Sequence, residues 1–309
     1  MSDSATTYFL RASPQKDART VEITRGDFHA YKEAQATLAR ALAVEQTYEV
    51  LVSNYLEFER FLLEEAATAM VRRDKPYERQ FAISMRATIR IVNLLTAARM
   101  YVEQAPLNVR ACVPDVGGML EKVKGLFSRQ YDDHAEYRFM EALRNHVQHH
   151  GMPVHWTEQG AGWTSHEGDE RLVYWVEIAS LRLVLSQNRK FKKRVLAELD
   201  DKVDLKLAVR RYVECLSRVH SEMRASLADP TTVARTRLRE AHERFGSSDP
   251  LESVTLTAIA APADGDEAVV PLLLEWDDMR LRLVERNKEL PNLHKTHASG
   301  RVRSHGGRP

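Results

Sequence analysis

Hydrophobic side chains recur at steps of three and four residues through most of the chain, which is the spacing of one face of an α-helix. The first such stretch runs from Asp27 to about Arg73 and contains neither glycine nor proline. Its apolar positions are Leu38, Leu42, Tyr48, Leu51, Val52, Tyr55, Phe58 and Leu62. The spacing predicts one long helix, or two helices with a bend between Val44 and Thr47.

Two further helices are expected before residue 133. One begins at Pro76, a residue favoured at the first helical position, and ends near Gln104, because the residue before Pro106 avoids the helical conformation. Its expected core-facing stripe is Phe81, Met85, Ile89, Val92 and Leu95 or Tyr101. Its arginines could guide a polyanion along the opposite side; they are Arg79, Arg86, Arg90 and Arg99. A shorter helix is expected over about Met119 to Tyr131, with Leu120, Val123 and Phe127 facing inward.

The pattern changes from helical to alternating after Gly151. Segments 154–157 and 171–178 have the period of β-strands, and the glycines between them suit turns, so we expect a β-hairpin. Its aromatic residues are expected to pack on one another, with a base-stacking platform as the alternative; they are Trp156, Trp163, Tyr174 and Trp175. Helical spacing returns over 188–199 and 204–227, and a proline at position 230 separates a further helix over 231–245.

Both ends of the chain have strand composition. Tyr8–Arg11 and Thr20–Thr24 are expected to form a small hairpin. After a linker at Gly246–Pro250, the expected elements are strands at 253–259 and 268–274 and a helix at 277–287. These C-terminal strands could pair with the N-terminal ones. From Glu289 onward the residues show no periodicity, which predicts disorder.

These patterns predict a mainly α protein: an up-and-down helical bundle with a β-hairpin insertion and a small α+β terminal appendage. The expected divisions are N-terminal extended segments at 1–26, the bundle at 27–228 with the hairpin at 154–178, the appendage at 229–288 and a disordered tail at 289–309.

Composition narrows the class of protein. Hydrophobic residues at 43% and charged residues at 29% are typical of a soluble globular protein, and no apolar run looks long enough to cross a bilayer. The 45 basic and 44 acidic residues leave a net charge of +1, which does not favour a nucleic-acid coat protein. Cys112 and Cys215 are isolated, so neither a disulfide scaffold nor a zinc site is indicated and a cytoplasmic location is expected. No glycine-rich phosphate loop is present, and no cofactor is expected.

One helix, expected over Asp133–Gly151, carries the strongest candidate chemistry. Asp132 or Asp133 can cap its start, and Gly151 with Pro153 stops it. An apolar arc of about 100° can dock into a core; it holds Phe139, Met140, Leu143 and Val147. A separate arc of about 140° gathers polar side chains, namely Arg138, Glu141, Arg144, Asn145, Gln148 and His149.

The chemistry of this polar arc suits a phosphate ligand. Arg144 offers a planar fork of donors that matches phosphate oxygens. His149 can exchange a proton near neutral pH, and Asn145, one turn before it, can orient the imidazole or a substrate oxygen.

The spacing Arg144-Asn145-x-x-x-His149 resembles the R-N-x-x-x-H signature of the HEPN superfamily, named for higher eukaryotes and prokaryotes nucleotide-binding proteins. The resemblance covers roughly Glu45 to Gly151 and implies a helical bundle with the motif late in it. It also implies a metal-independent endoribonuclease that acts as a homodimer with a composite site. RNA is then the expected partner, and control by a regulatory protein, as for a toxin or defence protein, is a further expectation.

The same resemblance implies a role for each motif residue. His149 would accept the proton of the RNA 2′-hydroxyl, Arg144 would hold the phosphate, and Asn145 would orient one of them. Arg138 and Gln148 are weaker candidates for substrate contact.

Alternatives remain open on the sequence. Polar side chains on a helix are ordinarily solvated, and a non-catalytic HEPN-like module that binds nucleotide, RNA or protein would use the same face. His146 and His150 have the i, i+4 spacing of metal ligands, but a metalloprotease has Glu where Val147 stands and no third ligand follows, so no metal site is expected. Instead, His146 is expected at the edge of the core. Acidic residues of the first long helix are expected to be solvated, or to pair with Arg144 or Arg138; they are Glu57, Glu59, Glu64 and Glu65.

Overall fold

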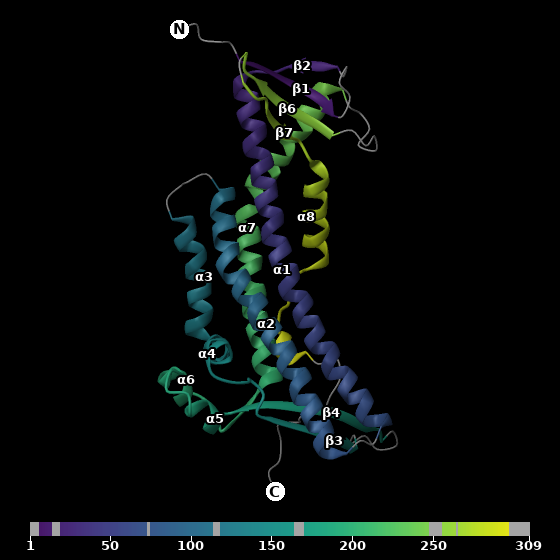
Figure 1. Cartoon of the computed structure of the whole chain (residues 1–309), viewed down its shortest axis with the longest axis vertical. Coiled ribbons are helices and arrows are strands. Elements are labelled where there is room, and N and C mark those ends of the chain that lie inside the picture. Colours follow the sequence, from purple (N-terminus) through teal and green to yellow (C-terminus); the bar gives the residue numbers. More distant parts are fainter. Residues whose placement is uncertain are drawn as a thin grey trace. The chain divides into compact units, whose positions relative to one another are not determined.

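The structure, a computed structural model, describes residues 6–13, 19–72, 75–113, 118–163, 170–246, 255–263 and 265–296. Helix accounts for 68% of the chain, which confirms a mainly α fold with small β-sheets (Figure 1). The helices are α1 (Arg25–Val71), α2 (Pro76–Cys112), α3 (Met119–Asp133), α4 (Ala135–His149), α5 (Arg182–Ser186), α6 (Lys193–Ala197), α7 (Leu205–Phe245), α8 (Leu274–Arg286) and the 3-10 turn η1 (Leu293–Lys295). The strands are β1 (Thr7–Ser13), β2 (Thr20–Glu22), β3 (Trp156–Trp163), β4 (Leu172–Leu181), β5 (Lys202–Asp204), β6 (Thr255–Ala261) and β7 (Ala268–Pro271).

The chain folds into two compact units, and the long helices α1, α2 and α7 contribute to both. Unit 1 comprises Met1–Tyr48, Glu103–Val123 and Ser221–Lys288. Unit 2 comprises Glu49–Val102, Lys124–His220 and Glu289–Pro309. The segments expected at 1–26 and 229–288 therefore share one unit, because the strands near the two ends of the chain are hydrogen-bonded to each other.

Unit 1 is built on a four-stranded antiparallel sheet in the order β2-β1-β6-β7 (Figure 1). The expected pairing of N-terminal with C-terminal strands is thus confirmed, with Leu10 opposite Ala258. One face of the sheet packs on residues from the start of α1 and the end of α7, among them Phe28, Leu38 and Leu238. Alternation along the strands places these apolar side chains on the covered face.

The start of α1 is a reciprocal capping box. The backbone N–H of Asp27 donates to Oγ1 of Thr24 at 3.0 Å, and the N–H of Thr24 donates to Oδ2 of Asp27 at 2.9 Å. This backbone hydrogen bond is the largest influence that lowers the pKa of Asp27. Thr24 is therefore the cap, and α1 continues as a single helix rather than as two with a bend.

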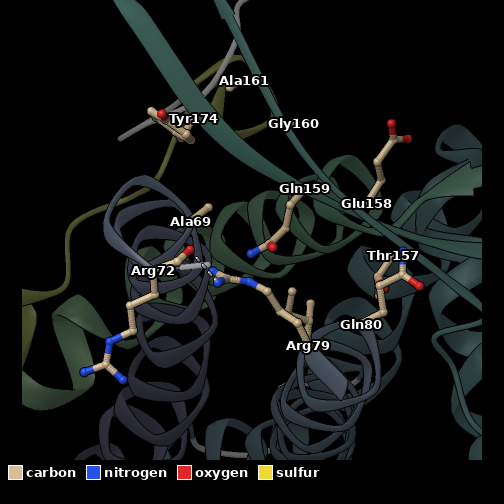
Figure 2. A pocket seen from close by; sticks show the side chains of 11 residues that line it. Ala69, Arg72, Arg79, Gln80, Thr157, Glu158, Gln159, Gly160, Ala161 and Tyr174 are labelled. Atoms are coloured by element: carbon tan, nitrogen blue, oxygen red, sulfur yellow. Dashed lines mark hydrogen bonds between the residues drawn. The ribbon is translucent and has the colours of Figure 1, made fainter. Parts of the chain in front are cut away.

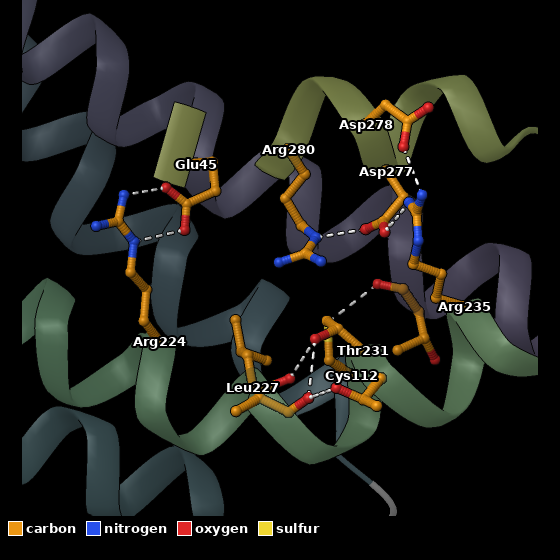
Figure 3. Close-up of polar contacts among 12 residues, drawn as sticks. Glu45, Cys112, Arg224, Leu227, Thr231, Arg235, Asp277, Asp278 and Arg280 are labelled. Carbon is orange, nitrogen blue, oxygen red and sulfur yellow. Dashed lines mark hydrogen bonds and ion pairs between the residues drawn. The ribbon is translucent and has the colours of Figure 1, made fainter. Parts of the chain in front are cut away.

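Buried ion pairs tie α1, α7 and α8 together inside unit 1 (Figure 3). Nε and Nη2 of Arg224 in α7 donate to the two carboxylate oxygens of Glu45 in α1, at 2.8 and 2.5 Å. Asp277 of α8 is fully buried and accepts hydrogen bonds from Arg235 at 2.6 Å and Arg280 at 2.5 Å. Bidentate contacts of this kind set the geometry of the helices they join.

Unit 2 carries the predicted hairpin, but its first strand runs over Trp156–Trp163 rather than 154–157, so Gly160 and Gly162, expected in turns, lie inside β3. β3 and β4 pair antiparallel, with Trp156 opposite Ala179 and Trp163 opposite Leu172. A third strand, β5, pairs with the end of β4 and was not predicted, because three residues are too few to show a period. The expected helix at 188–199 is reduced to the single turn of α6.

The first half of α2 places a different face in the core of unit 2 from the one expected, whereas Leu95 and Tyr101 are buried as predicted. Phe81, Met85 and Ile89 are exposed. The buried stripe lies on another side of the helix and includes Ile83, Ala87, Ile91, Leu94, Ala98 and Tyr101. Both stripes have helical spacing, so the sequence pattern alone favoured the larger side chains, whereas the small ones allow close packing with neighbouring helices.

Two prolines that were expected to end helices lie inside them. α2 continues through Pro106 to Cys112, and α7 continues through Pro230 to Phe245. Around Pro230, the hydroxyl of Thr231 donates to the carbonyl oxygens of Leu227 at 2.8 Å and Ala228 at 3.1 Å. These bonds go to neighbouring carbonyls and not to that of Ser226, which loses its usual donor at Pro230, so the tertiary packing of α7 is what outweighs the loss.

The tail expected to be disordered begins later than predicted. Residues 289–296 are described, and His294 bonds to Glu214 of α7 at 2.5 Å while the N–H of Leu290 donates to Ser217. Residues 297–309, and residues 247–250 of the expected linker, lie outside the described part of the chain.

Helix α2 meets the length and apolarity of a membrane-spanning helix over Tyr77–Cys112, with 44% of its most apolar window buried. This differs from the expectation that no apolar run of the sequence is long enough to cross a bilayer. A core helix passes the same test, so the property is weak evidence on a membrane.

Candidate functional site

The candidate helix α4 is shorter than expected and starts without a side-chain cap. α3 extends through Asp133, and the cap residue of α4 is His134, which makes no side-chain capping bond. Asp132 and Asp133 therefore do not cap α4. The helix ends at His149, and the N–H of Gly151 donates to the carbonyl oxygen of His146 at 3.2 Å, consistent with the predicted stop.

The apolar arc of α4 packs into the core of unit 2. Phe139, Met140 and Leu143 are buried at 1%, 0% and 0% exposure, as predicted, and Val147 is half-buried. This burial fixes the rotation of the helix, so the polar arc faces outward.

On that outward face Arg144 is half-buried, whereas Asn145, Gln148 and His149 are exposed. Nη1 of Arg144 donates to Oε1 of Gln148 at 3.2 Å. Within the described residues, Nε of Arg144 is buried without a hydrogen-bond partner, and no hydrogen bond joins Asn145 to His149. The face therefore presents an oriented guanidinium, an amide and an imidazole at one end of one helix.

Tyr212 of α7 was not predicted to belong to this region, whereas Glu141, its hydrogen-bond partner, was predicted on the polar arc. The hydroxyl of the fully buried Tyr212 donates to Oε1 of Glu141 at 2.6 Å. Burial first, and then the charge of Glu141, raises the pKa of Tyr212, while Arg144 acts in the opposite direction. The Glu141 carboxylate is thereby held by α7, and no sequence signal linked Tyr212 to the motif.

Arg138 differs from the other candidate residues because its guanidinium is already held by three hydrogen bonds within the protein. Its Nη1 donates to the carbonyl oxygens of Tyr131 at 2.8 Å and Asp132 at 2.7 Å, and its Nε donates to Glu198 at 2.9 Å. These bonds join the end of α3 to α4 and to α6. A phosphate contact by Arg138 remains a prediction that requires some of these bonds to break.

A cluster of imidazoles lies on another side of α4. His146 is 5% exposed, its Nδ1 is 3.1 Å from Nδ2 of Asn188, and its ring centroid is 6.2 Å from that of His150 and 6.3 Å from that of His155. Burial is the main cause that lowers the pKa of His146 and of His155. The rings border a cavity of about 280 Å³.

This cluster does not have the arrangement of a metal centre. Among the described residues, no three His, Cys, Asp or Glu side chains are placed to hold a metal ion. Nδ1 of His155 accepts a hydrogen bond from the N–H of Leu181 at 3.0 Å, so this ring is used to anchor β4. His146 is a core histidine, as expected.

The arginines of α2 do not form a free basic wall beside the motif. Arg86 pairs with Glu64 and Glu65 of α1, and Arg90 lies 3.7 Å from Glu57. The acidic residues of α1 thus pair with α2, and Glu59 pairs with Arg210 of α7 at 2.7 Å. None of these ion pairs involves Arg144 or Arg138.

A separate pocket of about 400 Å³ lies between the end of α1, the start of α2 and the β3–β4 hairpin (Figure 2). Figure 2 shows Gln159 pointing toward Arg79, and Glu158 pointing away from it. Nη1 of Arg79 donates to the carbonyl oxygen of Arg72 at 3.3 Å, while its Nε and Nη2 are buried in the wall. These contacts make the Arg79 guanidinium part of the wall rather than a group that reaches a ligand.

The hairpin aromatics do not form one stacking platform. Tyr174 lines the pocket, whereas Trp175, the next residue along β4, covers Gly160 and Gly162. Successive residues of a strand face opposite sides, so these two rings belong to different surfaces.

No protein-family model matches this chain, and no curated protein or solved structure shows significant similarity to it.

Proposed function

We propose that the chain is a HEPN-like endoribonuclease that cleaves single-stranded or looped RNA without a metal ion. The observation that supports this most is Arg144, half-buried on the outward face of α4, whose Nη1 is oriented by Gln148. An arginine held in this way can offer the Nη end of its guanidinium to a phosphate. Exposed Asn145 and His149 lie on the same end of the helix.

The proposed reaction needs no nucleophile from the protein, because the RNA 2′-hydroxyl is the nucleophile. His149 would accept the proton of the 2′-hydroxyl as its oxygen attacks the adjacent phosphorus. Arg144 would stabilise the charge that develops on the phosphoryl oxygens. The bond to the 5′-oxygen of the next nucleotide breaks, and that oxygen gains a proton. The products are a 2′,3′-cyclic phosphate and a 5′-hydroxyl.

One copy of α4 supplies a single Arg144 and a single His149. The proposal therefore includes a homodimer in which two such faces form a composite site, the commonest symmetry for a homo-oligomer. A regulatory protein that covers this face is a further partner that the proposal accommodates.

The decisive experiment is incubation of the purified protein with mixed RNA in the presence of EDTA. Arg144→Ala and His149→Ala should each abolish cleavage, with a loss of at least about a hundredfold for the proton acceptor. Two matched controls are available: His150→Ala, next to the proposed base, and Arg194→Ala, whose side chain is 87% exposed on α6. Both controls should cleave like the wild type.

DNA of the same sequence should resist cleavage because it lacks the 2′-hydroxyl. Cleavage that survives both motif substitutions, or that EDTA removes, refutes this mechanism.

A binding module is the second candidate, favoured by the absence of a hydrogen bond between Asn145 and His149 within the described residues. In that case the same face holds RNA or a nucleotide without cutting it. Arg144→Ala would then weaken RNA binding, measured by fluorescence anisotropy, while no cleavage would be seen for any variant.

A further inference from the structure

Helix α2 bears a second apolar stripe that faces solvent in unit 2. Tyr77, Phe81, Met85 and Ile89 follow one another at steps of four residues, so they lie along one side of the helix. Their exposed fractions are 82%, 62%, 37% and 51%. We call these four residues the outer stripe.

The outer stripe is the second of two apolar faces on the same helix segment. The other face is in the core, where Ile83, Ala87 and Ile91 are exposed by 2%, 0% and 0%. A helix that is apolar on more than one side is normally covered on both, inside a large protein, an assembly or a membrane. Only one of the two faces of α2 is covered by the described residues of this chain.

The outer stripe cannot turn into the core of unit 2, because ion pairs fix the rotation of α2. Arg86 pairs with Glu64, and Arg90 lies 3.7 Å from Glu57, so both arginines hold α2 against α1. Rotation that buried Phe81 would break these pairs and expose the core face of α2, which contains Ile83, Ala87 and Ile91.

We propose that the outer stripe is the contact surface for a second copy of this chain, packed antiparallel around a twofold axis. The equal steps of four residues make the stripe self-complementary. With the axis level with Ile83, Tyr77 lies opposite Ile89 of the other copy and Phe81 opposite Met85. Ridges formed by residues four apart pack at a crossing angle of about 50°.

The outer stripe supplies most of the area that a twofold interface needs. An aromatic side chain has roughly 150–250 Å² of surface, so Tyr77 and Phe81 at their observed exposure leave about 300 Å² open. With Met85 and Ile89, and with both copies counted, the stripe contributes roughly 800–1,000 Å², against the minimum of about 1,000 Å² for a specific interface. Flanking side chains of the two helices supply the remainder.

The charges that border the outer stripe favour a protein partner over a membrane. Helices that lie on a membrane carry cations available for anionic lipid. Here Lys75 is 3.5 Å from Glu78, and Arg86 and Arg90 are engaged by acidic residues of α1. The border is thus close to neutral, which suits an apolar contact between identical surfaces.

The first test is the mass of the protein in solution, measured by sedimentation or light scattering over a range of concentrations. The wild type should be a dimer, and Phe81→Glu should be a monomer with unchanged circular dichroism. Leu183→Glu is the matched control, because Leu183 is 75% exposed on α5 of the same unit. It should leave the dimer intact.

The second test places a thiol on the stripe. Met85→Cys should give a covalent dimer with a short bis-maleimide, and Leu183→Cys should not. The native thiols should not interfere, because Cys112 and Cys215 are buried and burial raises the pKa of each to about 12.

Several results would overturn the proposal: a monomeric wild type at every concentration, a dimer that survives Phe81→Glu, or a dimer without a Met85→Cys cross-link. So would a monomer that binds phosphatidylcholine–phosphatidylglycerol vesicles through Phe81, because the stripe would then be a lipid surface. The proposal shares with the ribonuclease only the expectation of two copies. A monomeric wild type would contradict both proposals. A dimer that survives Phe81→Glu contradicts only the outer stripe as its contact surface, and a Phe81-dependent dimer that does not cleave RNA in EDTA contradicts only the ribonuclease.

Discussion

Replacement of Asp277 by asparagine should destabilise unit 1 strongly. This carboxylate has 0% exposure and stands between Arg235 and Arg280, whose side chains are only 17% and 13% exposed (Figure 3). Asparagine keeps the shape but removes the charge and turns one acceptor into a donor that faces a guanidinium. Two partly buried cations then lose their main counter-charge.

The expected loss in free energy of unfolding depends on the hydrogen bonds that each arginine retains after the substitution. Breaking a buried ion pair costs about 3–5 kcal/mol. Arg235 retains a second bond to Asp278 at 2.6 Å, so the lower end of this range, about 3 kcal/mol, is expected. Asp278 is 50% exposed, and an exposed pair contributes about 1 kcal/mol or less. Asp278→Asn is therefore the matched control on the same helix and the same arginine.

Urea unfolding followed by circular dichroism measures both variants against the wild type. With a slope of roughly 1–3 kcal/mol per molar urea, Asp277→Asn should lower the midpoint by about 1 M or more, and Asp278→Asn by a few tenths. If unit 1 unfolds in a separate transition, only that transition should move, and amide exchange in α8 should quicken. Equal effects of the two substitutions would refute the argument from burial.

Two further predictions concern the hairpin and the histidines of unit 2. A Cβ on Gly160 would lie 2.4 Å from the ring of Trp175, so Gly160→Ala should lower the free energy of unfolding by about 1–3 kcal/mol, measured by thermal or urea unfolding. A Cβ on Gly162 would lie 3.3 Å from the same ring, so Gly162→Ala should cost clearly less. Equal costs would contradict this packing. Burial lowers the pKa of His146 and of His155 below 6.5, so in acid the unfolded chain binds more protons than the folded one. The stability that these two residues contribute should therefore be fully present above about pH 6.5 and decrease below it. Urea midpoints at about pH 7.5 and about pH 5.5 measure this, and a higher midpoint at the lower pH would contradict it.

Local signals predicted the elements around the motif well. The apolar arc of α4 and the glycine after it set the buried face and the end of the helix, because both depend on interactions within a few turns. Alternation within 154–157 and 171–178 predicted the β3–β4 pairing for the same reason. The start of α4 was misplaced, since the aspartates that resemble caps belong to the last turn of α3.

Errors arose wherever a distant segment decided between two locally equal choices. α2 has two apolar stripes of the same period, and the helices that pack on it selected the one with smaller side chains. Pro230 is tolerated because the packing of α7, with Leu227 and Ala234 buried, outweighs the missing donor. Residues 289–296 have no periodic pattern, yet Glu214 of α7 holds His294.

By itself, the sequence determined the helical class, the hairpin and the gathering of Arg144, Asn145, Gln148 and His149 on one face of a helix, because helical and strand periods are properties of neighbouring residues. Only the tertiary structure decided how each side chain is used. It bonds Arg138 to the end of α3 and leaves Nε of Arg144 without a partner within the described residues. It also leaves the outer stripe of α2 in solvent. These outcomes depend on which acceptors and apolar surfaces distant segments bring alongside, and no local period encodes that.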